Sequence, residues 1–220
     1  MKKILLLALF FTFNNLYSQL EGKYGFTAGA TNYITDSNLV FSKSGTGFTV
    51  GLVGTAEFDD FFRLIIEMDY NEHAVKFVGR EEYTSDPVDL KFKMTNFSLP
   101  ILLDYDFYEY DNFVFSGQAG PAVSFYYGYS LKDETKEDYL LEPFYASPTY
   151  LDFDKWSDKM SLNLFAAAGL SATYEEQYRL TFRYYYGITD PYRNASLVAI
   201  EKLEGQDSYF QLTFTYFLGF

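Results

Sequence analysis

His73 is the only histidine of the chain and the side chain best suited to general-base chemistry near neutral pH. Hydrolysis or acyl transfer would also require a nucleophile or a carboxylate within hydrogen-bond reach of this ring. The chain carries no Gly-x-Ser-x-Gly or comparable signature. We therefore expect a polar residue near the end of a strand and no enzyme. A hydrolase or acyltransferase that uses His73 is the alternative.

A second group of residues combines charges of both signs with a regular spacing. These residues alternate with apolar ones, and alternate residues of a β-strand share one face. In the interior of a small barrel, which side chains usually fill, such charges would form a plug of ion pairs, whereas a wider interior would make them the lining of a selective channel. We expect the plug, a lumen charge network of Arg63, Glu67, Asp69, Lys91, Lys93, Asp104, Arg179 and Arg183.

The composition of the chain excludes several kinds of site and partner. The formal net charge of −13 makes a nucleic-acid partner unexpected, and the absence of cysteine excludes disulfides and thiolate metal sites. The acidic residues between Ser130 and Lys159 match no EF-type calcium spacing, so we expect a solvated acidic loop and no metal or cofactor. Aromatic residues make up 21% of the chain, which favours strands.

The N-terminus has the pattern of an export signal. Lys2 and Lys3 precede the apolar run Ile4–Phe13, and Ser18 offers a small residue before a cleavage point. We predict a signal peptide over residues 1–18 and a barrel domain over residues 19–220.

The rest of the chain shows an alternation with a period of two residues, which predicts β-strands. Short turns and long connections alternate between these segments, so an up-and-down barrel would have all short turns at one rim, as outer-membrane barrels have in the periplasm. The predicted strands are 24–33, 46–58, 61–78, 89–107, 113–129, 160–174, 179–188 and 208–220.

The apolar faces of these strands decide between a membrane barrel and a soluble one. Their Phe, Tyr, Leu and Ile side chains would overfill the interior of eight strands, so they should face lipid. Near Asn96 the alternation slips by one residue, which predicts a β-bulge. We predict an all-β, eight-stranded antiparallel transmembrane barrel with short periplasmic turns and long extracellular loops. A lipocalin-like soluble barrel is the alternative.

The longest connection, Ser130–Lys159, is rich in apolar and aromatic residues. Such residues in an exposed loop indicate either a folded cap over the barrel or a surface for a protein partner. The possible partner surface consists of Tyr139, Phe144, Tyr145 and Trp156.

The segments Thr95–Leu103 and Gly117–Pro121 resemble the PorT-like outer-membrane β-barrel family of the Bacteroidota, through a Leu-Pro followed by apolar residues and then Ala-Gly-Pro. The resemblance implies a location in the outer membrane, with lipid around the barrel. It also implies that the barrel assembly machinery reads a C-terminal signal that includes Tyr216 and Phe220.

The function that these observations favour is a non-enzymatic barrel that stabilises the outer membrane or docks a partner through its long loops. A narrow porin-like channel for ions or small solutes is the alternative.

Overall fold

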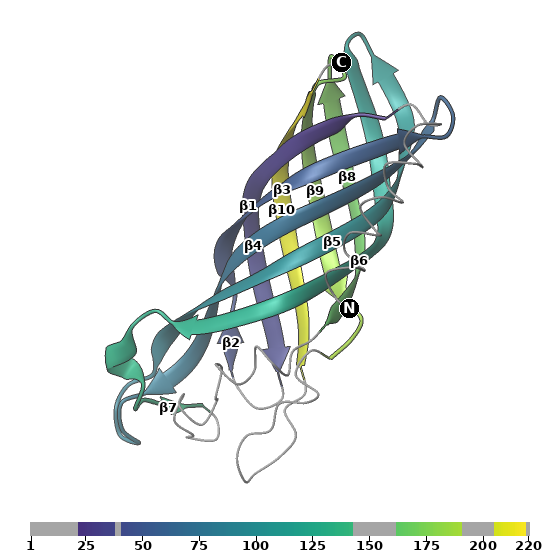
Figure 1. The fold of residues 1–220 in the computed structure, drawn as a ribbon. Helices are drawn as coiled ribbons and strands as arrows, with labels where there is room; N and C mark the ends of the chain where they lie inside the picture. Colours follow the sequence, from purple (N-terminus) through teal and green to yellow (C-terminus); the bar gives the residue numbers. More distant parts are fainter. Residues whose placement is uncertain (1–21, 38–40, 143–161, 191–204, 219–220) are drawn as a thin grey trace, which may run out of the picture.

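Eight long antiparallel strands close into a ring in the computed structural model, which describes residues 22–37, 41–142, 162–190 and 205–218 (Figure 1). The ring closes where the last strand pairs with the first, with Tyr24 opposite Leu218. Each strand overlaps its sequence prediction, so the predicted barrel is confirmed. The ring strands are β1 (Tyr24–Ser37), β3 (Gly45–Glu57), β4 (Phe62–Arg80), β5 (Val88–Tyr110), β6 (Phe113–Leu131), β8 (Asn163–Tyr174), β9 (Tyr178–Gly187) and β10 (Gly205–Leu218).

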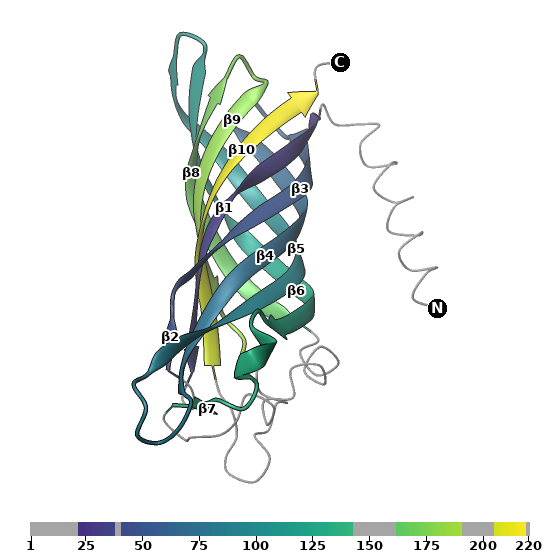
Figure 2. The ribbon, with the colours of Figure 1, turned by 90° about the vertical axis from the view of Figure 1, so that its left-hand side faces the viewer.

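The three short turns lie at one end of the barrel, the end at which β10 finishes (Figure 2). Asp59 Oδ1 accepts hydrogen bonds from the backbone N–H groups of Phe61 and Phe62, which fixes the β3–β4 turn. In the β8–β9 turn, Glu175 and Glu176 adopt positive φ angles of 49° and 57°. In outer-membrane barrels the end with short turns is periplasmic, and the opposite end is extracellular.

Strands β4, β5 and β6 continue together past β3 and β8 at the extracellular end. Strand β3 pairs with β4 only as far as His73, and β8 pairs with β6 only as far as Ser124. We call the part of the sheet beyond these points the extension; it comprises residues 74–80 of β4, 88–95 of β5 and 125–131 of β6. Two short strands, β2 (Ser42–Lys43) and β7 (Leu140–Leu141), pair with β4 there, and the 3₁₀-helix η1 spans Glu134–Lys136. The sequence analysis treated these short elements as loops, because two or three residues are too few to show a period.

From Leu90 to Asp106 the even-numbered residues of β5 point inward, but the polar and apolar residues exchange faces along its length. Leu90, Met94, Leu102 and Asp104 all point inward and are 0% exposed, whereas the odd-numbered residues point outward. The bulge predicted near Asn96 lies on the partner strand, because Thr95 pairs with Gly128 and Phe97 with Phe125, which leaves one extra residue on β6. The residue within it, Tyr126, has a φ of 55°.

The prediction that Lys91 and Lys93 point into the lumen is therefore wrong. Both lysines lie on the outer face of β5, whereas Phe92 and Met94 lie inside. That prediction requires apolar residues to face outward along the whole strand. In the extension there is no surrounding hydrocarbon, so the apolar residues turn inward and the charged ones face water, as in a soluble protein.

Inside the extension, apolar side chains pack into a core under β7 and the segment that leads to it. Leu131 and Tyr139 pack against this core from its edge. The core of the extension contains Val75, Phe77, Leu90, Phe92, Met94 and Leu141.

Around the barrel below the extension, the outer face carries a belt of exposed apolar and aromatic side chains. On β5 this belt extends from Phe97 to Phe107. At about 3.3 Å per residue and a tilt of about 45°, this stretch covers about 23 Å along the membrane normal, close to the apolar band of an outer-membrane barrel. Among the described residues, no helix is long and apolar enough to cross a membrane. Exposed members of the belt include Phe26, Phe48, Val50, Leu52, Met68, Phe97, Ile101, Leu103, Leu170, Leu180, Phe182, Phe210, Leu212 and Phe214.

Candidate functional site

Near the periplasmic end, the lumen contains a cluster of ion pairs built from three strands. Arg63 Nε on β4 lies 2.9 Å from Asp104 Oδ2 on β5, and Arg179 Nη2 on β9 lies 3.4 Å from the same oxygen. Arg63 also pairs with Asp106, whose Oδ1 accepts a hydrogen bond of 2.6 Å from Ser116 Oγ. The positive charges of two arginines thus compensate the negative charges of two carboxylates that are largely buried.

Deeper in the lumen, Arg183 on β9 spans the barrel to Glu67 on β4. Arg183 Nη1 and Nη2 donate to the two carboxylate oxygens of Glu67 at 2.5 and 2.7 Å, and Arg183 Nε donates to Gln118 Oε1 at 2.7 Å. Gly169 on β8 leaves the space for this arginine, because a Cβ there would lie 2.6 Å from Arg183 Cγ. The bidentate geometry fixes both side chains across the lumen.

Asp69 is also in the lumen, at 0% exposure, and neither of its carboxylate oxygens has a hydrogen-bond partner among the described residues. Of the predicted network, Lys91 and Lys93 alone lie outside the barrel. Asp106 and Gln118 also take part in these contacts and are not among the residues predicted from the sequence, although both belong to the same inward alternation as Asp104 and Ser116. The predicted residues that the structure brings into the lumen are Arg63, Glu67, Asp69, Asp104, Arg179 and Arg183.

Above the ion pairs, a layer of stacked aromatic rings fills the lumen. The Tyr185 and Tyr209 rings lie 4.3 Å apart at 6°, Tyr33 lies 5.5 Å from Tyr209, and His73 lies 4.4 Å from Tyr33. Tyr185 Oη donates a hydrogen bond of 3.0 Å to Gln211 Oε1. Stacked rings make favourable contacts, and these side chains occupy the lumen at this level.

His73 belongs to this layer and is 0% exposed. Its Nδ1 lies 2.9 Å from Thr31 Oγ1. The predicted place near the extracellular rim is wrong, because β4 continues to Arg80 and carries the rim farther out. An alternating pattern alone does not reveal how far a strand continues beyond the membrane.

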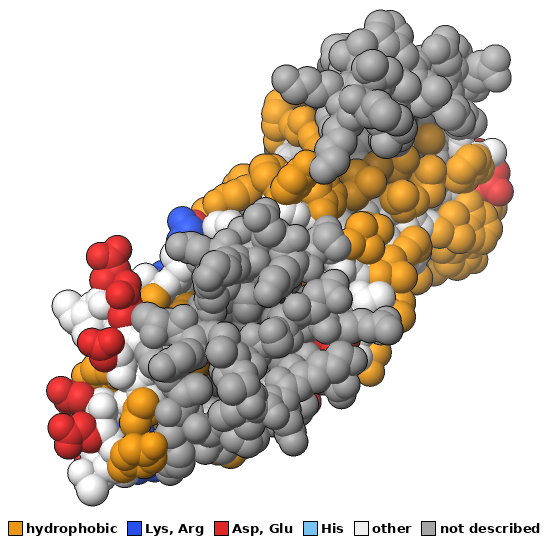
Figure 3. Space-filling model, turned by 60° about the horizontal axis from the view of Figure 1, so that its bottom comes forward, with side chains coloured by type: hydrophobic (Ala, Val, Ile, Leu, Met, Phe, Trp, Pro, Cys, Tyr) orange, Lys and Arg blue, Asp and Glu red, His pale blue; other side chains and the backbone are white. Residues whose placement is uncertain are grey.

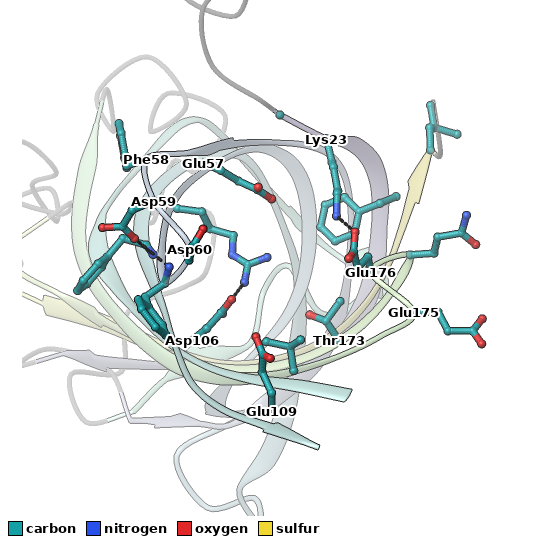
Figure 4. Close-up of a pocket in the computed structure, with 18 residues that line it drawn as sticks. Lys23, Glu57, Phe58, Asp59, Asp60, Asp106, Glu109, Thr173, Glu175 and Glu176 are labelled. Atoms are coloured by element: carbon teal, nitrogen blue, oxygen red, sulfur yellow. Dashed lines mark hydrogen bonds and ion pairs between the residues drawn. The ribbon is translucent and has the colours of Figure 1, made fainter. Parts of the chain in front are cut away.

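The periplasmic mouth of the barrel opens into a cavity of about 920 Å³ (Figure 4). Lys23 Nζ lies 2.6 Å from Glu176 Oε2 at its edge, and this hydrogen bond holds the pKa of Glu176 below its usual value. Arg63 and Asp106 are among the residues that line it, so the cavity reaches the ion pairs of the lumen. No cluster of three metal-ligating His, Asp or Glu side chains occurs in the part of the chain that the structure describes. Acidic residues that line the cavity are Glu57, Asp59, Asp60, Asp106, Glu109, Glu175 and Glu176.

The other residues singled out in the sequence fall at the two ends of the molecule. Tyr139 packs against the core of the extension, with Lys136 Nζ 5.9 Å from the centre of its ring. Tyr216 points outward from β10, 40% exposed, and its ring lies 5.5 Å from that of Tyr178. Phe144, Tyr145, Trp156 and Phe220 lie outside the described residues.

The end of the extension differs from the belt in the surface that it presents. Figure 3 shows hydrophobic side chains gathered over the barrel and acidic ones toward the extracellular end. The β4–β5 connection supplies exposed Glu81, Glu82 and Asp86. The two surfaces fit two different surroundings, hydrocarbon for the belt and water for the extension.

A closed ring of eight antiparallel strands, a polar and filled lumen, and an apolar outer belt define an integral β-barrel protein of the outer membrane. The chain belongs to the family described as outer membrane protein beta-barrel domain, whose model matches residues 12–193. Strand β10, which closes the ring, lies beyond this match. The protein is located in the outer membrane, where lipid surrounds its belt.

Solved structures of small outer-membrane barrels are similar to the chain at low sequence identity. OprG from Pseudomonas aeruginosa has a TM-score of 0.47 and 13% identity, over 91% of this chain and 98% of that one. Ail of Yersinia pestis, in complex with the heparin analogue sucrose octasulfate, has a TM-score of 0.46 and 13% identity, over 90% and 100%. Neisserial surface protein A has a TM-score of 0.44 and 14% identity, over 89% and 98%. No curated protein sequence matches the chain.

Proposed function

We propose that the protein is a non-conducting, non-enzymatic barrel that presents its extension and extracellular loops to an external or membrane partner. The observation that carries this proposal is the occupied lumen. The ion pairs of Arg63 and Arg179 with Asp104, and of Arg183 with Glu67, lie in series with the stack of aromatic rings. An ion that crossed the barrel would have to separate these contacts, and separating buried charges is costly.

Single-channel recording in planar bilayers tests the closed lumen against the alternative of a narrow channel. We expect no discrete conductance steps for the natural protein. A matched double variant, Glu67→Ala with Arg183→Ala, removes the deeper pair without leaving either charge alone, and it is expected to raise ion leakage. Discrete steps from the natural protein would contradict the proposal and favour the channel.

The enzyme alternative depends on His73, and the position of this residue argues against it. The ring is stacked on Tyr33 and hydrogen-bonded to Thr31, away from solvent. We expect outer-membrane lipids to keep the same acyl composition whether cells express the natural protein or a His73→Ala variant. An acylated or deacylated lipid that appears only with the natural protein would overturn the non-enzymatic assignment.

The biogenesis of the barrel is part of the same proposal. Removal of a signal peptide over residues 1–18 would leave Gln19 as the first residue, which sequencing of the mature N-terminus tests directly. Recognition of Tyr216 and Phe220 by the barrel assembly machinery predicts that deletion of Phe220 lowers the amount of folded protein. Membership of the PorT-like family is supported by the segments Thr95–Leu103 and Gly117–Pro121, which meet on neighbouring strands, with Leu103 of β5 opposite Ala119 of β6.

A further inference from the structure

Four lysines form a single row across the outer face of the extension. Lys43 on β2 lies opposite Lys76 on β4, which lies opposite Lys91 on β5. The backbone N–H of Lys132 donates a hydrogen bond of 2.9 Å to the carbonyl oxygen of Lys91, so Lys132 continues the row beyond β6. We call these four residues the lysine row. Adjacent strands lie about 4.8 Å apart, so the ammonium groups can converge on one ligand.

A row of like charges is unfavourable unless something compensates it. Cross-strand pairs of like charge destabilise a sheet, and the row contains two such pairs in direct register, Lys43 with Lys76 and Lys76 with Lys91. Asp89 forms an ion pair with Lys43. Within the described part of the chain, Lys76, Lys91 and Lys132 have no ion-pair partner. The positive charge is therefore left available for an external anion.

Two acidic residues near the row form ion pairs with basic residues outside it. Glu72, on the membrane side of the row, pairs with Lys93 at 2.6 Å. Glu142, beyond the row, pairs with Arg80. The net charge of the chain is −13, so the molecule as a whole does not attract anions. The lysine-rich surface is a local exception to this negative charge.

The row lies just outside the apolar belt. On the outer face of β5, the belt ends at Phe97, and Thr95, Lys93 and Lys91 follow in that order toward the extracellular end. At about 3.3 Å per residue and a tilt of about 45°, Lys93 lies about 9 Å and Lys91 about 14 Å above Phe97. This is the level of the lipid headgroups, and lysine side chains extend several ångströms toward such an interface.

We propose that the lysine row binds the phosphate groups of a phosphorylated glycolipid headgroup in the outer leaflet. Lys76 and Lys91 hold the phosphate at the centre of the row, and Lys43 and Lys132 complete the positive surface. The lipid chains of the same molecule lie along the belt around Phe97 and Tyr70. The site does not depend on whether the lumen conducts, so bilayer recording and lipid binding test separate claims.

Native mass spectrometry of the purified full-length protein with bisphosphorylated lipid A tests the site. The variant Lys76→Gln with Lys91→Gln removes the two central charges, and the control Lys23→Gln with Lys136→Gln removes two lysines elsewhere. We expect the first variant to bind lipid A about tenfold more weakly or worse, and the control to bind as the natural protein does. Dephosphorylated lipid A should bind no better to the natural protein than to the central variant.

Three other outcomes would overturn the proposal, and each would indicate a different cause of lipid binding. Equal loss of lipid A in both variants would mean that total charge, and not the row, attracts the lipid. Unchanged binding in the central variant would place the lipid elsewhere. Competition by millimolar inorganic phosphate as strong as by lipid A would indicate a site for free anions instead of a lipid headgroup. Heat-modifiable migration of each variant confirms that the barrel has folded.

Discussion

The lumen and the extension are built from the same strands, yet they arrange polarity in opposite ways. In the lumen, Asp104 and Asp106 of β5 point inward, and Ile101 and Leu103 point outward. In the extension, Leu90 and Phe92 of the same strand point inward and Lys91 points outward. The strand keeps its geometric phase throughout, so the surroundings decide which face is apolar.

This difference marks the edge of the membrane on the protein itself. Below the change near Thr95 and Asn96, hydrocarbon surrounds the barrel, and the polar side chains are confined to the lumen, where they pair. Above it, water surrounds the sheet, and an apolar core becomes the favourable arrangement. A single strand therefore combines the patterns of a membrane barrel and of a soluble sheet.

The largest expected effect comes from breaking the charge pairing of the lumen. Arg183→Gln leaves Glu67 as a buried carboxylate without its bidentate partner, and the loss of one member of a buried pair costs about 3–5 kcal/mol. Urea unfolding in lipid vesicles, followed by the folded and unfolded bands on a gel, measures this cost. The double variant Glu67→Leu with Arg183→Met is the control, and it should recover most of the loss. If the double variant is as unstable as Arg183→Gln, the unpaired Glu67 carboxylate is not the cause of the lost stability.

A core substitution in the extension tests the other region. Phe92→Ala removes a buried ring from the core of the extension, at a cost of about 3 kcal/mol. Because the extension projects beyond the part of the sheet that closes into a ring, we expect this loss to appear as local opening. Limited proteolysis should cut the extension faster while the heat-modifiable migration of the barrel stays unchanged. Loss of that migration would show that the two regions fold as one unit.

Substitutions on the outer face place the boundary between the two regions. Ile101→Lys puts a charge in the middle of the belt and should cost about 2 kcal/mol of folding free energy in vesicles. Lys91→Ile changes a side chain that faces water and should alter the same quantity by less than about 0.5 kcal/mol. Equal effects of the two substitutions would contradict a membrane edge between these positions.

The smallest effect is expected at the periplasmic mouth. The hydrogen bond from Lys23 lowers the pKa of Glu176 in the folded state, so the stabilisation is present above the unfolded pKa and is lost as pH falls through the folded one. Glu176→Gln should therefore lower stability slightly at pH 7 and leave it unchanged near pH 3. Because Glu176 is exposed at a turn and Lys23 is only partly buried, the difference at pH 7 should be small. A larger loss of stability in Glu176→Gln at pH 3 than at pH 7 would contradict a lowered pKa of Glu176 in the folded state.

The sequence predicted the architecture well because the barrel repeats one simple pattern. Alternation and turn lengths located every ring strand, and mixed charges indicated the pairing that Arg63, Glu67, Asp104, Arg179 and Arg183 show. The sequence does not reveal the extension, because a strand with one apolar face shows the same alternation whether that face points inward or outward. The sequence therefore predicts Lys91 and Lys93 in the lumen and His73 at the rim. Contacts between distant strands, such as Arg179 of β9 with Asp104 of β5, depend on the register and tilt of the strands, which the sequence does not state.

The exchange of polar and apolar faces along β5, which we call the inversion, is tested most directly by cysteine scanning, since the natural chain contains no cysteine. Single cysteines at Phe97, Met94, Lys93 and Lys91 would be labelled in outer-membrane vesicles with a water-soluble reagent and with a lipid-soluble one. We predict that the cysteines at positions 91 and 93 react with the water-soluble reagent, that the cysteine at 97 reacts with the lipid-soluble one, and that the cysteine at 94 is protected from both. Reaction of position 94 from the lipid, with positions 91 and 93 protected, would contradict the inversion and return both lysines to the lumen.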